Sequence, residues 1–326
     1  MRTMIAVLFT AFCTFFTSMA YGVPIVIKFS HVVNDDTPKG KMAHRFEELV
    51  EKKLSGKVEV EVYSDSELAN DDEVVDKILA GEIQMGAPAM SKLKKYTDKL
   101  ALFDLPFLFT GIGAVDKFNG SEQGKSLLRS MKGKGITGLG YLHNGMKQFS
   151  ANRPLFSPDD AKGLKFRIMS SDVLVAQFEA LGATPLKKPF KEVYGLLESG
   201  EIDGQENTWS NIYSKKFYEV QEYITESDHG YLGYMILTST KFWDAFDAAT
   251  RKELEKILAE AIAFGNQIAV KKAIHDKLEI KKREKAKIIT LKAKNKKKWV
   301  DAMKPVWRQF DGKIGKELID AAYASN

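Results

Sequence analysis

The sequence predicts an α/β fold made of two similar lobes, and three observations lead to this prediction. Strand and helix patterns alternate in the first third of the chain, a short motif recurs near its middle, and one helical pattern covers residues 249–284. The length of 326 residues also fits two domains better than one.

The alternation begins with an apolar strand and a helix that starts at Pro38, carries apolar side chains at the helical period, and ends at Gly56. Valines then alternate with charged residues, which predicts a second strand. A second helix begins at Asp71 and ends at Gly81. The expected strands are 26–33, 58–62 and 83–87. This order is typical of a parallel sheet.

The recurring motif supports two lobes of the same design. Glu73–Val74, six further residues and Gly81–Ile83 match Glu192–Val193, six further residues and Gly200–Ile202. Each copy predicts an amphipathic helix that ends at a glycine and leads into a short strand. The helix expected over 249–284 has no proline and is long enough to span both lobes.

Residues 1–22 differ from the rest. Arg2 is the only charged residue, Met4 to Phe16 is almost entirely apolar, and Ala20 ends a small-residue pattern, which predicts a secretory signal peptide. Cys13, the only cysteine, lies within this segment, so the mature chain is expected to contain no disulfide and no thiol nucleophile. We expect an exported, periplasmic protein.

The formal net charge is +6, and 13 lysine or arginine residues fall within 271–298. That stretch has no aromatic residue for stacking on bases, so a solvated helix face is expected and no nucleic-acid partner.

Enzyme motifs are weak. The Gly133–Gly138 run matches G-x-G-x-x-G, but the predicted helix precedes it and the strand follows, which is the wrong order for a dinucleotide site. The five histidines show no metal-ligand spacing, and no G-x-S-x-G is present. We therefore expect a binding protein with no cofactor and no catalytic residues.

A candidate ligand site lies in the second half of the chain. Arg167 lies between apolar residues in a short predicted strand, where an unpaired charge would be costly. Asn207, Trp209 and Asn211 follow a turn signal at Asp203–Gly204. A planar cation with amides and an aromatic face suits a small carboxylate.

Further cationic or polar groups lie at predicted strand ends, where open α/β sheets bind ligands. His31 ends the first strand and Lys39 begins the next helix, while Lys92 and Lys147 follow later strands. A lone lysine at such a place is more often a solvated surface charge, but four cationic groups at strand ends, with few acids beside them, favour a binding site. Trp209 and Phe190 are compatible with either a cleft or a core position.

These residues belong to runs that resemble the substrate-binding proteins of TRAP transporters, the tripartite ATP-independent periplasmic systems, over essentially the whole mature chain. The most specific runs are Gly163–Arg167, Pro189–Tyr194 and Gly204–Asn207. The resemblance to the dicarboxylate-binding branch rests on 27–33, 37–40, 104–109, 143–147, 209–214 and 225–230.

The resemblance implies a type II-like periplasmic binding protein fold, in which each lobe is a mixed or parallel sheet flanked by helices. Crossing strands and a long helix would join the two lobes around a cleft. It implies that Arg167 binds a ligand carboxylate with support from Asn207, and that Phe190 lines the cleft. Lys39 and Lys92 would face the far carboxylate. Lys147 stands where sialic-acid-binding relatives carry arginine, which argues against sialic acid.

From this resemblance we expect one lobe at 23–144 with 233–272, and the other at 145–232 with 273–326. The expected function is capture of a C4-dicarboxylate of the succinate, fumarate or malate type and its delivery to a membrane permease. Met169, where a polar residue is expected, leaves the choice of acid open. Alternatives are another organic acid, namely a keto, sugar or aromatic acid, a secreted hydrolase or lyase acting on such acids, or a ligand sensor.

Overall fold

The computed structural model describes residues 23–326, so the predicted signal peptide lies outside the described part of the chain. The described residues form one mixed sheet in the order β2-β1-β3-β8-β4-β7-β5-β6, with β9 paired to β8. The strands are β1 Ile25–Ser30, β2 Val58–Tyr63, β3 Met85–Gly86, β4 Ile136–Ala151, β5 Lys165–Ile168, β6 Thr184–Lys187, β7 Gly204–Thr208, β8 Tyr223–Ser239 and β9 Lys287–Thr290.

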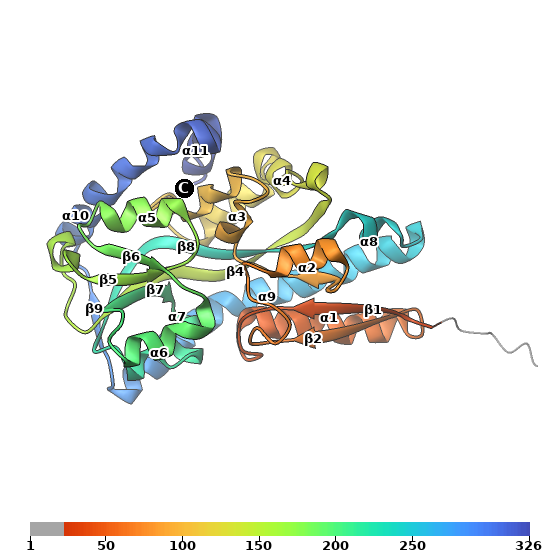
Figure 1. Cartoon of the computed structure of the whole chain (residues 1–326), viewed down its shortest axis with the longest axis horizontal. Helices are drawn as coiled ribbons and strands as arrows, with labels where there is room; N and C mark the ends of the chain where they lie inside the picture. The colour runs from red at the N-terminus through yellow and green to blue at the C-terminus, as the bar shows by residue number, and fades with distance from the viewer. Residues whose placement is uncertain (1–22) are drawn as a thin grey trace, which may run out of the picture.

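Helices cover the sheet and connect its strands (Figure 1). They are α1 Pro38–Leu54, α2 Val74–Ala80, α3 Ile112–Gly120, α4 Glu122–Leu128, α5 Asp172–Glu179, α6 Val193–Glu198, α7 Trp209–Ser214, α8 Thr240–Asp244, α9 Ala248–Arg283, α10 Ala293–Met303 and α11 Lys316–Tyr323.

Two units of the same topology make up the ends of the sheet. In the first unit, β1 to β3, β1 pairs in parallel with β2 and β3, and in the second unit, β5 to β7, β5 pairs in parallel with β6 and β7. Figure 1 shows the first unit at the right and the second at the left. The recurring motif therefore marks a true structural repeat: α2 ends at Gly81 with φ 82°, and Gly200 after α6 has φ 72°.

The centre of the sheet is antiparallel, which makes the sheet a mixed one, whereas the strand–helix order of the first unit indicated only its own parallel pairing. Two long strands, β4 with 16 residues and β8 with 17, pair with each other and run between the units. β3 joins β8 and β7 joins β4, both antiparallel. The β4–β8 ladder shifts register around His143/Gly145 and Lys147/Phe149, so the strands are irregular where the units meet.

The long helix α9 confirms the expected element over 249–284 almost to the residue. Asp247 caps its N-terminus by accepting from the amides of Ala249 and Thr250, and Glu284 ends it with a positive φ of 54°. Because α9 packs against both α1 and α7, it contacts both units (Figure 1).

The C-terminal segment packs back on the middle of the chain. The indole of Trp307 donates to the carbonyl of Pro106 at 2.9 Å, and Asn326 Nδ2 donates to the carbonyl of Leu108 at 2.9 Å. Val306, Phe310 and Ile314 join the apolar cluster of 102–118. The residues after α10 therefore belong with 99–120, and Figure 1 shows α11 beside α3 and α4.

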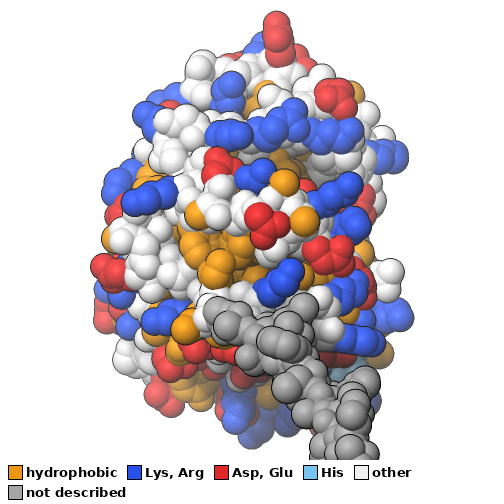
Figure 2. All heavy atoms as spheres, turned by 90° about the vertical axis from the view of Figure 1, so that its right-hand side faces the viewer, with side chains coloured by type: hydrophobic (Ala, Val, Ile, Leu, Met, Phe, Trp, Pro, Cys, Tyr) orange, Lys and Arg blue, Asp and Glu red, His pale blue; other side chains and the backbone are white. Residues whose placement is uncertain are grey.

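Charges of both signs are mixed on the end of the molecule that Figure 2 faces, around a patch of apolar side chains. The lysines of 271–298 are divided among α9, β9 and α10 rather than forming one helix face. Within 23–326, no helix is long and apolar enough to cross a membrane.

Candidate functional site

A cavity with an empty volume of about 540 Å³ lies between the two units. The first unit and its loops contribute mainly polar side chains, the second contributes a cation and amides, and β4 and β8 form the floor. The lining residues are Val32, Val33, Ser66, Asn70, Asp71, Asp72, Ala89, Lys92, Lys147, Arg167, Met169, Pro189, Phe190, Glu206, Asn207, Asn211, Leu232 and Tyr234.

Arg167 on β5 lines this cavity as predicted and is almost fully buried. Its Nε donates to the carbonyl of Lys188 at 2.9 Å, and its guanidinium carbon lies 5.9 Å from the ring centre of Phe190. Among the described residues, none accepts a hydrogen bond from its Nη atoms. Burial lowers the pKa of Arg167 to about 10, although Glu206 and Asp71 act against the shift. It remains a cation with donors free for a ligand.

Lys147 also lines the cavity, but its charge is already paired inside the protein. Its Nζ lies 2.6 Å from Glu206 Oε1, and His229 Nε2 lies 2.7 Å from Glu206 Oε2. Burial acts to raise the pKa of Glu206, but Lys147 and His229 outweigh it and lower that pKa to about 2. A Cβ at residue 230 would lie 2.7 Å from the Lys147 side chain, so Gly230 leaves room for this buried pair.

Lys92 lines the cavity and links the two units. Its Nζ lies 2.6 Å from Asp72 Oδ2 and donates to Ser170 Oγ at 3.1 Å, and its side chain is only 4% exposed. Asp72 is 42% exposed, so this pair is partly open to solvent. Lys92 can therefore exchange Asp72 for a ligand anion with a smaller desolvation cost than Lys147 would have.

Asn207 and Asn211 belong to a buried amide network behind Arg167. Asn211 Nδ2 donates to Asn207 Oδ1 at 2.7 Å, and Asn144 Nδ2 donates to Asn211 Oδ1 at 3.1 Å and to the Tyr234 hydroxyl at 2.6 Å. Thr208 caps α7 by accepting from the Asn211 amide. The network fixes the orientation of the asparagines and leaves the Asn207 amide nitrogen free to donate.

His31 and Lys39 do not line the cavity. Lys39 Nζ donates to the carbonyl of Ala87 at 2.8 Å and lies 3.5 Å from the ring centre of Tyr234, and burial lowers its pKa to about 8. His31 is buried with neither ring nitrogen hydrogen-bonded to a described residue, and burial lowers its pKa to about 3. Both residues lie behind the wall.

Trp209 begins α7 but faces a different groove, between α7 and α9. Lys277 Nζ lies 5.5 Å from its ring centre. The structure therefore brings Arg167, Asn207, Asn211, Phe190, Lys92 and Lys147 together and leaves Trp209, His31 and Lys39 outside the lining.

Sequence reasoning missed Glu206, Asp71, Asp72 and Tyr234 as lining residues. A signal for Glu206 was present: a buried Lys147 needs a partner for the same reason as Arg167, and Glu206 lies in the quoted run 204–207. Asp71 was assigned only to a helix start. Its Oδ2 accepts from the Ala89 amide at 3.0 Å, a contact that depends on tertiary structure.

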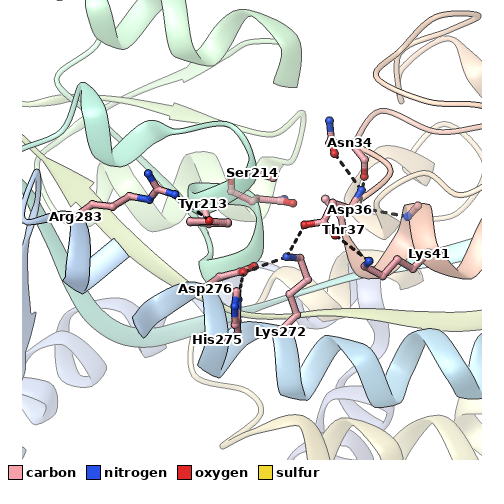
Figure 3. Close-up of polar contacts among 12 residues, drawn as sticks. Asn34, Asp36, Thr37, Lys41, Tyr213, Ser214, Lys272, His275, Asp276 and Arg283 are labelled. Atoms are coloured by element: carbon pink, nitrogen blue, oxygen red, sulfur yellow. Dashed lines mark hydrogen bonds and ion pairs between the residues drawn. The ribbon is translucent and has the colours of Figure 1, made fainter. Parts of the chain in front are cut away.

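Ion pairs cross from one unit to the other around the cavity. Lys215 after α7 lies 2.5 Å from Asp65 after β2, and Lys94 pairs with Asp172 at the start of α5. Figure 3 shows Lys272 of α9 between Asp276 and Asp36, at 3.0 and 3.1 Å, close to Tyr213 of the second unit. The first two pairs join the units directly, and Lys272 ties α9 to the loop before α1.

The site offers charged groups and hydrogen-bond donors. Among residues 23–326, no group of three His, Cys, Asp or Glu is arranged to hold a metal ion. Its central groups are a buried guanidinium and fixed amide donors, which bind a planar anion through directional hydrogen bonds.

Comparisons with known proteins agree with this geometry. The family model for bacterial extracellular solute-binding protein family 7 matches residues 29–313. The C4-dicarboxylate-binding periplasmic protein DctP of Shewanella loihica is 55% identical over 94% of this chain and 91% of the relative. The DctP of Vibrio cholerae is 48% identical over 93% of this chain and 91% of the relative.

Solved structures show the same architecture. A TRAP periplasmic solute-binding protein from Shewanella oneidensis with bound succinate is 54% identical, has a TM-score of 0.92 and covers 93% of this chain and 100% of its own. A protein of the same kind from Pseudomonas aeruginosa with bound L-malate is 46% identical, with a TM-score of 0.86 and coverage of 88% and 100%. The predicted two-lobed fold and the resemblance to dicarboxylate-binding TRAP proteins are confirmed, and the chain belongs to bacterial extracellular solute-binding protein family 7.

Proposed function

We propose that this chain captures a C4-dicarboxylate in the periplasm and delivers it to the membrane permease of a TRAP transporter. The observation that carries the proposal is Arg167, a buried guanidinium that lines the cavity and whose Nη atoms donate to no acceptor within residues 23–326. Relatives named for C4-dicarboxylate binding and a 54% identical structure with bound succinate support it.

Arg167 is the fixed end of the proposed site. Its planar fork can bind one carboxylate through two parallel hydrogen bonds, and Asn207 can add a third. Phe190 packs beside the guanidinium and excludes water from this pair. Because the amide network already orients the asparagines, little conformational entropy is lost when the ligand binds.

Lys92 is the proposed partner of the second carboxylate. Lys147 is neutralised by Glu206, so it adds no free charge to the cavity. Lys92 also has an acidic partner, Asp72, but this aspartate is partly exposed and can move to solvent. Lys39 then acts indirectly, because it supports the ring of Tyr234, which does line the cavity.

Closing of two lobes is the proposed mechanism of capture. The expected division at 23–144 with 233–272 and 145–232 with 273–326 is supported by the sheet, since β3 joins β8 at 237–238 and β7 joins β4 at 147–151. The packing of the C-terminal residues on 99–120 leads us to assign 304–326 to the first lobe. The proposed role involves no chemical conversion of the ligand.

Calorimetry on the mature protein tests this function. Succinate, fumarate and L-malate should bind, whereas butyrate, which lacks the second carboxylate, should bind at least tenfold more weakly. Galactonate tests the alternative of a sugar acid. Preferential binding of galactonate would contradict the C4-dicarboxylate assignment, and a change in the NMR spectrum of the ligand on incubation would indicate an enzyme.

A further inference from the structure

The outer face of α9 carries apolar side chains that no described residue covers. Val270, Ile274 and Leu278 follow one another at a spacing of four residues and are 48%, 62% and 51% exposed. Residues at this spacing share one face of a helix, so the three form a continuous stripe, here called the α9 stripe. Exposed apolar patches of this kind mark interaction sites.

A groove lies beside the α9 stripe. Val270 and Ile274 form one rim, Ala269 and Ala273 form part of the wall, and Met146 and Trp209 lie across from them. The groove is open to solvent, with an empty space of about 610 Å³, and is lined mostly by apolar atoms. A groove of this shape can accept an inserted apolar side chain, whereas a partner with a flat surface would leave it unfilled.

The groove lies directly behind the ligand cavity. Asn144 and Gly145 line the groove where the β4–β8 ladder shifts register, and Gly145 has a φ of 151°. Asn144 donates to Asn211, which lines the cavity, and Trp209 lies two residues before Asn211 on α7. A change in the irregular part of β4 on closing would therefore alter the groove as well as the cavity.

The charges around the α9 stripe indicate the occupant. Lys271 and Lys281 lie three residues from Ile274 and Leu278 on the same side of α9, and neither forms an ion pair with a described carboxylate. Asp228, a carboxylate in the groove lining, lies 3.8 Å from Lys296, so an acidic partner would still gain the two unpaired cations Lys271 and Lys281. A second copy of this chain docked face to face would place these lysines against each other, and a flat lipid surface would leave the groove empty.

We propose that the α9 stripe and its groove are a docking site for a segment of the membrane permease that presents an apolar side chain flanked by acidic residues. This inference rests on the proposed transport function. Because the groove shares Asn144 with the ligand network, the docked segment would distinguish the closed form from the open form.

The test measures binding of the succinate-loaded protein to the permease subunits in lipid nanodiscs. Ile274→Glu places a carboxylate on the groove rim, and Lys271→Glu with Lys281→Glu reverses the flanking charges. Each variant should weaken permease binding at least tenfold and leave the Kd for succinate within twofold. Leu79→Glu, an equally drastic change at a 41% exposed position of α2, is the matched control and should bind normally.

Each contrary result has a distinct meaning. Unchanged permease binding by Ile274→Glu overturns the docking site while leaving the transport function intact. If the variants lose binding to nanodiscs without permease to the same extent, the stripe binds lipid and the docking site is overturned. If the unaltered chain is a dimer in sedimentation and Ile274→Glu is a monomer, the stripe is a self-association surface and the docking site is likewise overturned. If succinate does not bind the unaltered chain, the proposed function itself fails, and this result is read by calorimetry without the permease.

Discussion

The first unit, β1 to β3, and the second unit, β5 to β7, share a topology but contribute different charged groups to the cavity. The second unit contributes Arg167, with two fixed amides beside it, and Glu206, whose charge Lys147 neutralises. The first contributes Asp71 and Asp72, and the lysine that follows its last strand is held by Asp72. Repetition of a backbone therefore does not repeat the site.

This difference assigns separate tasks to the two ends of the cavity. Arg167 and its amides are held by buried contacts and form a rigid anchor. Lys92 and Asp72 lie at a partly exposed edge and can rearrange. The pair of Lys147 and Glu206 lies between them as a structural element, since it is fully buried and internally neutral.

The strongest test of that structural role is Glu206→Gln, which leaves Lys147 buried without its anion. Breaking a buried pair on one side costs about 3–5 kcal/mol, so the free energy of unfolding should fall by about that amount. Urea unfolding without ligand measures it. Glu198→Gln, at an exposed position of α6, is the control. A loss below about 1 kcal/mol would mean that solvent reaches Lys147.

Arg167→Lys tests the rigid anchor. The substitution keeps the charge and loses the two-pronged geometry, so succinate binding should weaken by about 2–4 kcal/mol, roughly 30- to 1,000-fold in Kd. Calorimetry on folded protein measures the change, with Arg153→Lys at an exposed turn as the control. A loss under about threefold would make Arg167 a structural residue.

The buried His31 should make the free energy of unfolding depend on pH. Burial lowers its pKa from 6.5 to about 3, so the folded state resists protonation that the unfolded chain accepts. Its contribution is fully present above pH 6.5 and is lost as the pH falls toward 3.

Between pH 7 and pH 4 this one group should cost about 2–3 kcal/mol of unfolding free energy. His31→Leu should reduce the loss by that amount in urea unfolding at the two pH values. His44→Leu is the control, because Glu47 and Asp35 outweigh partial burial and raise the pKa of His44. An equal acid loss in His31→Leu and the unaltered chain would show that His31 becomes protonated without unfolding.

The sequence was enough to predict the repeat, the long helix and Arg167, because each is visible in local pattern. Helical period and glycine stops define α1 and α2, a long helical period without proline defines α9, and a cation within a short apolar strand is conspicuous. The antiparallel centre could not be located from local pattern, since apolar alternation is the same whichever way a neighbouring strand runs, and only the family resemblance allowed for a mixed sheet.

Contacts between distant residues also escaped the sequence. Lys39, Lys92 and Lys147 looked alike as lysines near strand ends, but their environments differ. Lys39 is buried behind the residues that line the cavity, Lys92 pairs with the partly exposed Asp72, and Lys147 forms a buried pair with Glu206. Those differences depend on partners 20 to 59 residues away in the chain. Which of these lysines lines the cavity is decided by tertiary contacts, which the local sequence does not show.

The role of Lys92 and Asp72, the pair at the partly exposed edge of the cavity, is tested by the charge-balanced double variant Lys92→Met with Asp72→Asn. It removes the pair together, so no unpaired aspartate repels the ligand. Succinate affinity should fall about tenfold, about 1.4 kcal/mol, while butyrate affinity should not change, because butyrate has no second carboxylate. Calorimetry with both acids measures the difference, and an equal effect on the two would remove Lys92 from the distal site.

The smallest expected effect concerns Lys215 and Asp65, which join the two units at the cavity edge at 2.5 Å. Both side chains are partly exposed, at 24% and 43%, so the pair is worth about 0.2–1 kcal/mol.

Because this pair can form only when the units approach, Lys215→Met should weaken succinate binding less than about fivefold. Calorimetry at low and at 0.5 M salt separates this effect from packing, since salt screens an exposed pair. The difference between variant and unaltered chain should disappear at high salt. The Nζ of Lys215 lies 5.7 Å from the ring centre of Phe190. A difference that persists at high salt would therefore mean that the methylene groups of Lys215 contribute by packing within the second unit alone.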